Sequence, residues 1–264
     1  MQTERLDVLM VERGMAHSRT LAQRLVMAGQ VRVNGQVHIK PSSKVSLDAV
    51  IELEMGPKYV SRGGEKLEAA LIAFDRVALS GWVCADVGAS TGGFTDCLLQ
   101  SGATRVYAID VGHGILDWRL RQDKRVVVME KTNARHVEML PELVDLVTID
   151  ASFISLKVLL PVVTRWLNLS GEIIALIKPQ FEAGRQEVAR GSGVVRAPEV
   201  HRKVLIDILT SCQNQGWSIG GLIKSPLTGP KGNIEFLVWL RQDDSGLDMP
   251  ELVEGVMSAA SGAS

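Results

Sequence analysis

Seven short apolar runs separated by helical stretches most constrain how this chain can fold. The runs have the length of strands, and most are apolar without interruption, from "WVCADVG" at Trp82 to "IEFLVWL" at Ile234. Such strands are typical of a mostly parallel sheet that helices cover on both faces. The last two runs are joined only by "PLTGPKGN", which is too short for a helical crossover and predicts one antiparallel pair. We therefore predict an α/β domain with a seven-stranded, mostly parallel sheet over residues 65–241.

The first 57 residues follow a different pattern. "LDVLMVERG" and "SRTLAQRLVMAG" predict two short helices, each ending at a glycine. "VRVNGQVHI" places Asn34-Gly35 between alternating valines, which predicts a hairpin, and "AVIELE" predicts a further strand. We therefore predict a small α+β domain at residues 1–57 and an interdomain hinge at 58–64. The acidic residues 242–264 are predicted to form a disordered tail.

Charge is unevenly distributed although the net charge is only −1. Six Lys and Arg side chains and no acidic ones lie between Arg13 and Lys44, whereas five acidic and no basic residues follow Arg241. This asymmetry favours a polyanionic partner over a merely solvated basic face.

The three cysteines are scattered, which argues against a disulfide framework or a metal site and suits the cytoplasm. The apolar runs are too short to span a membrane, and the N-terminus lacks a secretory pattern. We therefore expect a cytoplasmic protein without a membrane partner.

The N-terminal domain resembles the S4 RNA-binding domain. The resemblance rests on "LD", "SR", Ala22, the "VNG" hairpin and Pro41, in that order. It implies RNA as the partner, with the helix and hairpin face meeting RNA phosphates. The residues implied are Arg13, Arg19, Arg24, Arg32 and Lys40.

The segment "DVGASTGGFTDCLL" occupies the turn where doubly wound sheets bind ligands. It lacks the GxGxxG pattern of NAD sites, and a carboxylate at Asp86 would repel a pyrophosphate. S-adenosylmethionine fits better, because its carboxylate suits a helix N-terminus and its sulfonium and amine suit Asp86. Asp110 is placed to accept the ribose hydroxyls, and Asn133 to contact the adenine. The other predicted cofactor-binding residues are Gly88, Ser90, Gly92, Gly93 and Phe94. A purely structural glycine turn is the alternative.

Four charged residues interrupt apolar segments at one predicted edge of the sheet: Lys66, Asp150, Lys178 and Glu235. Buried charges are paired or functional, so two ordinary ion pairs are the alternative to a catalytic set. The segment "DASF" lacks the prolines of base-amino methyltransferases, and no cysteine nucleophile lies nearby. A ribose 2′-hydroxyl needs deprotonation, so we assign Lys178 as the base and Lys66 as its neighbour. The two carboxylates would align them.

The larger domain is similar to the FtsJ-like part of the TlyA family of ribosomal-RNA 2′-O-methyltransferases. The resemblance rests on "YVSRGGEKL", "DVGASTGGFTDCLL", "TIDASFISL", "LIKPQFE" and "SPLTGPKGNIEFL". It implies a Rossmann-like class I methyltransferase fold, S-adenosylmethionine as donor, and a cytidine 2′-hydroxyl in 23S and, in some members, 16S rRNA or ribosomal subunits as acceptor. In the glycine-rich segment after Lys178, Arg185, Arg190 and Arg196 are expected to grip phosphates.

Two other functional classes stay open at this point. One is a non-catalytic RNA-binding or ribosome-assembly factor. The other is a membrane-damaging protein, since some family members are labelled hemolysins.

Overall fold

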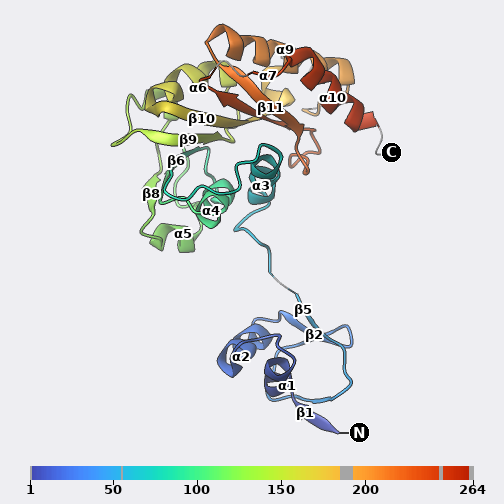
Figure 1. Cartoon of the computed structure of the whole chain (residues 1–264). Helices are drawn as coiled ribbons and strands as arrows, with labels where there is room; N and C mark the ends of the chain where they lie inside the picture. The colour runs from blue at the N-terminus through green and yellow to red at the C-terminus, as the bar shows by residue number, and fades with distance from the viewer. Residues whose placement is uncertain (1, 55, 185–192, 244–245, 262–264) are drawn as a thin grey trace. The chain divides into compact units, whose positions relative to one another are not determined.

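The computed structural model describes residues 2–54, 56–184, 193–243 and 246–261. The chain divides into two compact units, Met1–Lys58 and Tyr59–Ser264 (Figure 1). The larger unit carries the sheet predicted above, and the smaller unit carries the two predicted helices and the hairpin.

The N-terminal unit packs two helices against short antiparallel strands. Helix α2 is capped by Ser18, whose Oγ accepts a hydrogen bond from the Leu21 amide at 3.3 Å. Asn34 and Gly35 both have positive φ, as the predicted two-residue hairpin requires. The strands form a sheet of order β3-β2-β5 and a separate β1-β4 pair. The elements are β1 (Thr3–Arg5), α1 (Leu6–Glu12), α2 (Arg19–Met27), β2 (Val31–Val33), β3 (Gln36–His38), β4 (Lys44–Ser46) and β5 (Ile51–Leu53).

A buried carboxylate joins the two helices of this unit. Asp7 on α1 is fully buried and accepts hydrogen bonds from Arg5, from Arg19 at 2.9 Å and from Gln23 at 2.8 Å. The Arg5 guanidinium contributes most to holding the pKa of Asp7 well below its ordinary value. Arg19 and Gln23 lie on α2, so this one carboxylate ties α2 to α1.

The C-terminal unit contains a seven-stranded sheet of order β11-β12-β10-β9-β6-β7-β8. The neighbours from β10 to β8 are parallel, and β12 is antiparallel to both β10 and β11. The mostly parallel sheet and its late antiparallel pairing are therefore confirmed. The strands are β6 (Val83–Val87), β7 (Arg105–Ile109), β8 (Val126–Met129), β9 (Val144–Ile149), β10 (Leu167–Ile177), β11 (Ser218–Lys224) and β12 (Phe236–Arg241).

Helices cover both faces of this sheet, with α3, α4 and α5 on one side and α6, α9 and α10 on the other (Figure 1). Two apolar clusters form accordingly, and the fully buried Trp166 and Leu67 belong to different ones. The helical segments are α3 (Gly63–Ala73), α4 (Gly93–Gln100), α5 (Trp118–Gln122), η1 (Ala134–His136), α6 (Leu156–Val163), η2 (Thr164–Trp166), α7 (Pro179–Glu182), α9 (Pro198–Asn214) and α10 (Met249–Ser261).

Most of the predicted hinge is a packed part of the C-terminal unit. Tyr59 is only 5% exposed and belongs to the same apolar cluster as Phe94. The Val60 amide donates to Asp96 Oδ2 at 2.8 Å, and α3 already begins at Gly63. The prediction of a hinge over 58–64 was therefore wrong from Tyr59 onward, because an aromatic ring there is buried rather than solvated.

The predicted disordered tail is also corrected. Residues 249–261 form α10, which buries Val253, Val256 and Met257 in the cluster shared with α9 and the sheet. Arg202 on α9 forms an ion pair with Glu254. Two of the acidic residues, Glu251 and Glu254, lie on this helix, whose other side is apolar. Composition alone suggested disorder, whereas the helical spacing of the apolar residues buries one face.

We expect Val253→Asp to lower the melting temperature, because it places an unpaired charge in an apolar cluster where Val253 is 1% exposed. The loss in free energy of unfolding should exceed about 2 kcal/mol. Glu251→Ala, at an exposed position of the same helix, is the control and should unfold like the wild type. Equal melting temperatures for all three proteins would show that α10 does not dock.

Candidate active site

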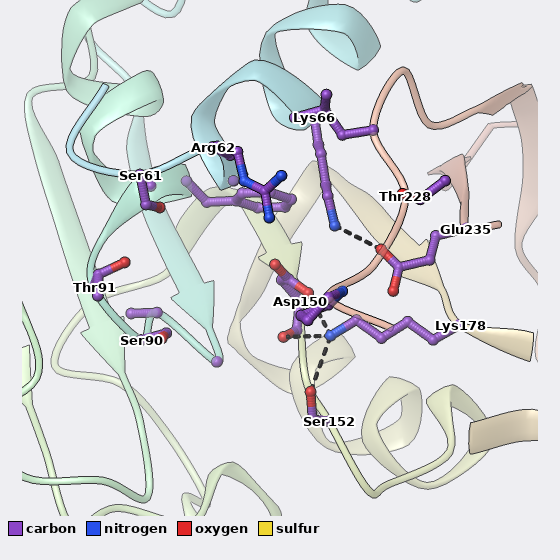
Figure 2. Close-up of a pocket in the computed structure, with 17 residues that line it drawn as sticks. Ser61, Arg62, Lys66, Ser90, Thr91, Asp150, Ser152, Lys178, Thr228 and Glu235 are labelled. Atoms are coloured by element: carbon purple, nitrogen blue, oxygen red, sulfur yellow. Dashed lines mark hydrogen bonds and ion pairs between the residues drawn. The ribbon is translucent and has the colours of Figure 1, made fainter. Parts of the chain in front are cut away.

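Three parallel strands end at one edge of the sheet, and the residues after them form the floor of the site. Gly88 follows β6, Asp150 follows β9, and Lys178 follows β10. Because β12 runs antiparallel to β10, the N-terminal end of β12 lies at the same edge and brings Glu235 there. Lys66 comes from the first turn of α3. The topology thus gathers the four predicted charged residues (Figure 2).

The four side chains form two ion pairs. Lys66 Nζ lies 2.6 Å from Glu235 Oε2, and Lys178 Nζ lies 2.6 Å from Asp150 Oδ1. Lys66 and Lys178 are each 9% exposed and Glu235 is 2% exposed. Each buried ammonium therefore has its own carboxylate, which offsets the cost of removing both from water.

Further polar contacts fix each pair. Lys178 Nζ also donates to the Ser152 hydroxyl at 3.1 Å and to the Asp150 carbonyl oxygen at 3.3 Å. The Gln180 side-chain amide donates to Glu235 Oε1 at 3.1 Å. Lys178 is thus held at the end of β10 by the turn that follows β9.

A cavity of about 320 Å³ opens over these pairs and is called the charged cavity here. Figure 2 shows Lys66 and Arg62 entering it from one side and Lys178 from another. Its walls also include Gly88, Ser90, Gly93, Phe94, Ser152 and Thr228.

A second cavity of about 310 Å³, the apolar cavity, adjoins the first. Apolar side chains including Ile109, Ile115 and Leu159 line it, together with Asp110 and Asn133. Four residues belong to the walls of both cavities and mark their junction: Gly88, Ser90, Asp150 and Ser152.

The glycine turn makes the junction possible. Gly88 has φ +84°, and a Cβ there would lie 2.7 Å from the Asp150 carbonyl oxygen. A Cβ on Gly93 would lie 2.3 Å from Ser61 Oγ. Only glycine allows the loop after β6 to approach the turn after β9 and the start of α3 so closely.

The predicted cofactor residues fall into three places. Gly88, Ser90, Gly93 and Phe94 line the charged cavity, and Asp110 and Asn133 line the apolar one. Asp110 accepts backbone hydrogen bonds from Ser90 at 2.8 Å and Gly112 at 2.7 Å. Gly92 lines neither cavity and is the left-handed N-cap of α4, with φ 97°.

Asp86 departs from the expected contact with cofactor cations. Its side chain is fully buried, lines neither cavity, and accepts hydrogen bonds from Thr95 at 2.7 Å and Thr148 at 3.2 Å. Burial raises the pKa of Asp86 to about 7. The carboxyl therefore joins β6 to Thr95 of α4 and Thr148 of β9 rather than facing a cofactor.

The predicted RNA-contacting residues of the N-terminal unit fall into two groups, those that bond to other groups of the unit and those that are exposed. Arg13 donates to the carbonyl oxygens of Leu47 and Ala49, and Arg32 pairs with Glu54. Arg19 pairs with the buried Asp7, as shown above. Arg24 and Lys40 are exposed.

The predicted phosphate-gripping arginines lie around the glycine-rich segment. Arg196 is exposed, whereas Arg185 and Arg190 lie outside the described residues.

Sequence reasoning missed nine residues that line the charged cavity, among them Arg62, Ser152 and Thr228. Arg62 lies four residues before Lys66, a spacing that places both on one side of a helix, so this signal was available. Ser152 and Thr228 lie in loops, whose shape the sequence does not fix.

Comparison with known proteins identifies the family. The FtsJ-like methyltransferase profile matches residues 59–242, and the S4 domain profile matches residues 4–51. A Mycobacterium tuberculosis protein named 16S/23S rRNA (cytidine-2′-O)-methyltransferase TlyA is 44% identical, over 97% of each chain. The chain belongs to the TlyA family of FtsJ-like methyltransferases.

Other TlyA-like proteins carry a different name. Hemolysin A of Brachyspira hyodysenteriae is 42% identical over 88% of this chain and 98% of its own. A solved Streptococcus thermophilus structure, also named as a hemolysin, has 43% identity and a TM-score of 0.74 over 99% of this chain and 96% of its own. Within the described ranges, no helix is both long and apolar enough to cross a membrane.

The adjoining cavities fit S-adenosylmethionine, the methyl donor of such an enzyme. The apolar walls suit an adenine, and Asp110 uses two of its four lone-pair sites on backbone amides, which leaves two for ribose hydroxyls. The N-terminus of α4 at Gly93 reaches the charged cavity and favours a carboxylate.

We expect Asp86→Asn to change how stability depends on pH. Because the pKa of Asp86 is raised to about 7, the folded protein holds its proton where the unfolded chain, with a pKa near 3.8, has lost it. Wild-type stability therefore falls as pH rises from 4 to 7, by at most about 4 kcal/mol from this group. As pH rises from 4 to 7, the melting temperature of Asp86→Asn should therefore rise relative to that of the wild type. Asp248→Asn, at an exposed position, is the control, and a pH-independent difference for Asp86→Asn would contradict the prediction.

Proposed function

We propose that this protein transfers a methyl group from S-adenosylmethionine to the 2′-hydroxyl of a cytidine in ribosomal RNA, with Lys178 as the base. The observation that carries the proposal is the junction of the two cavities, where Lys178 is paired with Asp150 and adjoins a second buried pair. The names of the relatives point to the same reaction.

The apolar cavity is where the donor's nucleoside would lie, with Asp110 on the ribose and Asn133 beside the adenine. When bound, S-adenosylmethionine supplies an electrophilic methyl group on a cationic sulfur. Gly88 and Ser90 would position its reactive end at the junction.

The charged cavity would hold the acceptor ribose. A 2′-hydroxyl is a weak nucleophile until its proton leaves, and Lys178 Nζ is the amine nearest the junction. Asp150 holds Lys178 in place, and the Lys66–Glu235 pair fixes the opposite wall. Holding the oxygen in line with the methyl group supplies much of the rate.

Binding of the RNA is assigned to the S4 domain and to Arg62 and Arg196 of the catalytic unit. Arg24 and Lys40 are the most direct candidates for phosphate contacts in the S4 domain, since Arg13, Arg19 and Arg32 hold other groups of that unit. The proposed targets are 23S rRNA and also 16S rRNA, as RNA or within ribosomal subunits.

We expect Lys178→Ala to abolish methyl transfer to undermethylated ribosomal subunits, measured with a labelled donor and by mass spectrometry of the modified nucleoside. Affinity for S-adenosylmethionine should stay within about threefold, because Lys178 is a wall of the charged cavity and not of the apolar one. Lys157→Ala, which removes a surface lysine paired with Asp207, should leave transfer unchanged. Substantial turnover by Lys178→Ala would reassign the base, and no turnover by the wild type on any subunit would favour a non-catalytic RNA-binding role.

We expect the double variant Arg24→Glu, Lys40→Glu to weaken RNA binding and to reduce its dependence on salt. Each lost phosphate contact lowers the slope of log affinity against log salt by about 0.9 on a duplex. Arg19 is left intact, because a glutamate there would face the buried Asp7 and unfold the domain. Lys203→Glu on α9 is the control. An unchanged slope in the double variant would reject this surface.

A further inference from the structure

Three oxygens surround the amine of Lys178. Asp150 Oδ1 lies at 2.6 Å, the Asp150 carbonyl oxygen at 3.3 Å and Ser152 Oγ at 3.1 Å. Nζ donates hydrogen bonds to the Asp150 carbonyl oxygen and to Ser152 Oγ, whereas Asp150 Oδ1 lies within ion-pair distance without a hydrogen bond. When Lys178 is neutral and able to accept a proton, it keeps two N–H groups and gains one lone pair.

The two kinds of oxygen are not equivalent. Neither the Asp150 carbonyl oxygen nor its carboxylate carries a hydrogen, so neither can donate to the lone pair of a neutral Lys178. The Ser152 hydroxyl can accept from an ammonium or donate to an amine by rotating its hydrogen. The lone pair of a neutral Lys178 therefore faces Ser152 Oγ.

Ser152 also lies where the acceptor oxygen must come. It is exposed and belongs to the walls of both cavities, whereas the Lys178 side chain is only 10% exposed. Ser90, the other serine at the junction, donates its amide to Asp110 on the apolar side. A substrate oxygen at the junction can thus meet the Ser152 hydroxyl, whereas Lys178 lines only the charged cavity.

We propose that Ser152 relays the proton of the target 2′-hydroxyl to Lys178, an inference that rests on the proposed function. As the 2′-oxygen forms its bond to the methyl carbon, the carbon–sulfur electron pair stays on sulfur, which becomes a neutral thioether. The 2′ O–H bond breaks and its proton bonds to Ser152 Oγ. The original Ser152 proton passes to Lys178 Nζ, which ends as the ammonium paired with Asp150. Ser152 ends as it began, so it is a catalytic residue that is not consumed.

The test measures single-turnover methyl transfer to undermethylated subunits in mixtures of H₂O and D₂O. Two protons move together in the relay, so the wild-type rate should curve against the deuterium fraction. Ser152→Ala should lower the rate by about 30-fold or more and make the plot linear, with the affinity for subunits within about twofold. Ser152→Thr keeps the hydroxyl and should stay within about threefold, with the curve retained. Ser80→Ala, at an exposed position outside both cavities, is the control.

The relay is overturned if Ser152→Ala transfers methyl groups at the wild-type rate while Lys178→Ala is inactive, a result that leaves the proposed function standing. It is also overturned if Ser152→Ala is slow but its plot stays curved, since the hydroxyl would then only position Lys178. An active Lys178→Ala defeats the proposed base and the relay together. Ser152→Cys keeps the side-chain size with a weaker donor. If the alanine variant fails to fold, Ser152→Cys takes its place in the comparison of rate and curvature with the wild type.

Discussion

The pairing of buried charges at one sheet edge is the interaction on which the rest of the site depends. Lys66, Lys178 and Glu235 are almost removed from water, and an isolated charge in that position would be costly. The structure meets this cost with two short ion pairs, each joining elements far apart in the chain: α3 with β12, and β10 with the turn after β9. Removing Asp150, Lys66 or Glu235 would leave a buried partner unpaired, so the chemistry and the local fold share the same residues.

The antiparallel placement of β12 is what completes this set. In a purely parallel sheet, the start of β12 would lie at the opposite edge, and Glu235 would be a strand length away from Lys66. Because β12 pairs with β10 in the reverse direction, Phe236 lies opposite Ile177, and the flanking Glu235 and Lys178 come to the same end. The glycine turn after β6 then closes the arrangement, since Gly88 permits the close approach of Asp150.

The N-terminal unit uses its basic residues for two purposes. The buried Asp7 joins its two helices, and Arg5 and Arg19 compensate the charge of this carboxylate. Arg13 ties α1 to the carbonyl oxygens near β5. A basic side chain in this unit is therefore not by itself a sign of RNA contact, and the exposed Arg24 and Lys40 are better placed for it.

The sequence by itself determined the succession of helices and strands along the chain, the glycine turn and the identity of the four charged residues. These depend on local patterns: uninterrupted apolar runs mark buried strands, and a charge within such a run needs a partner. It did not determine which lysine pairs with which carboxylate, that Asp86 faces inward, or that Ser152 contacts Lys178. Nor did it show that Tyr59 and α10 are packed, because the apolar surfaces that receive them come from distant segments. Pairing and burial are properties of side chains brought together through space, so only the tertiary structure decided them.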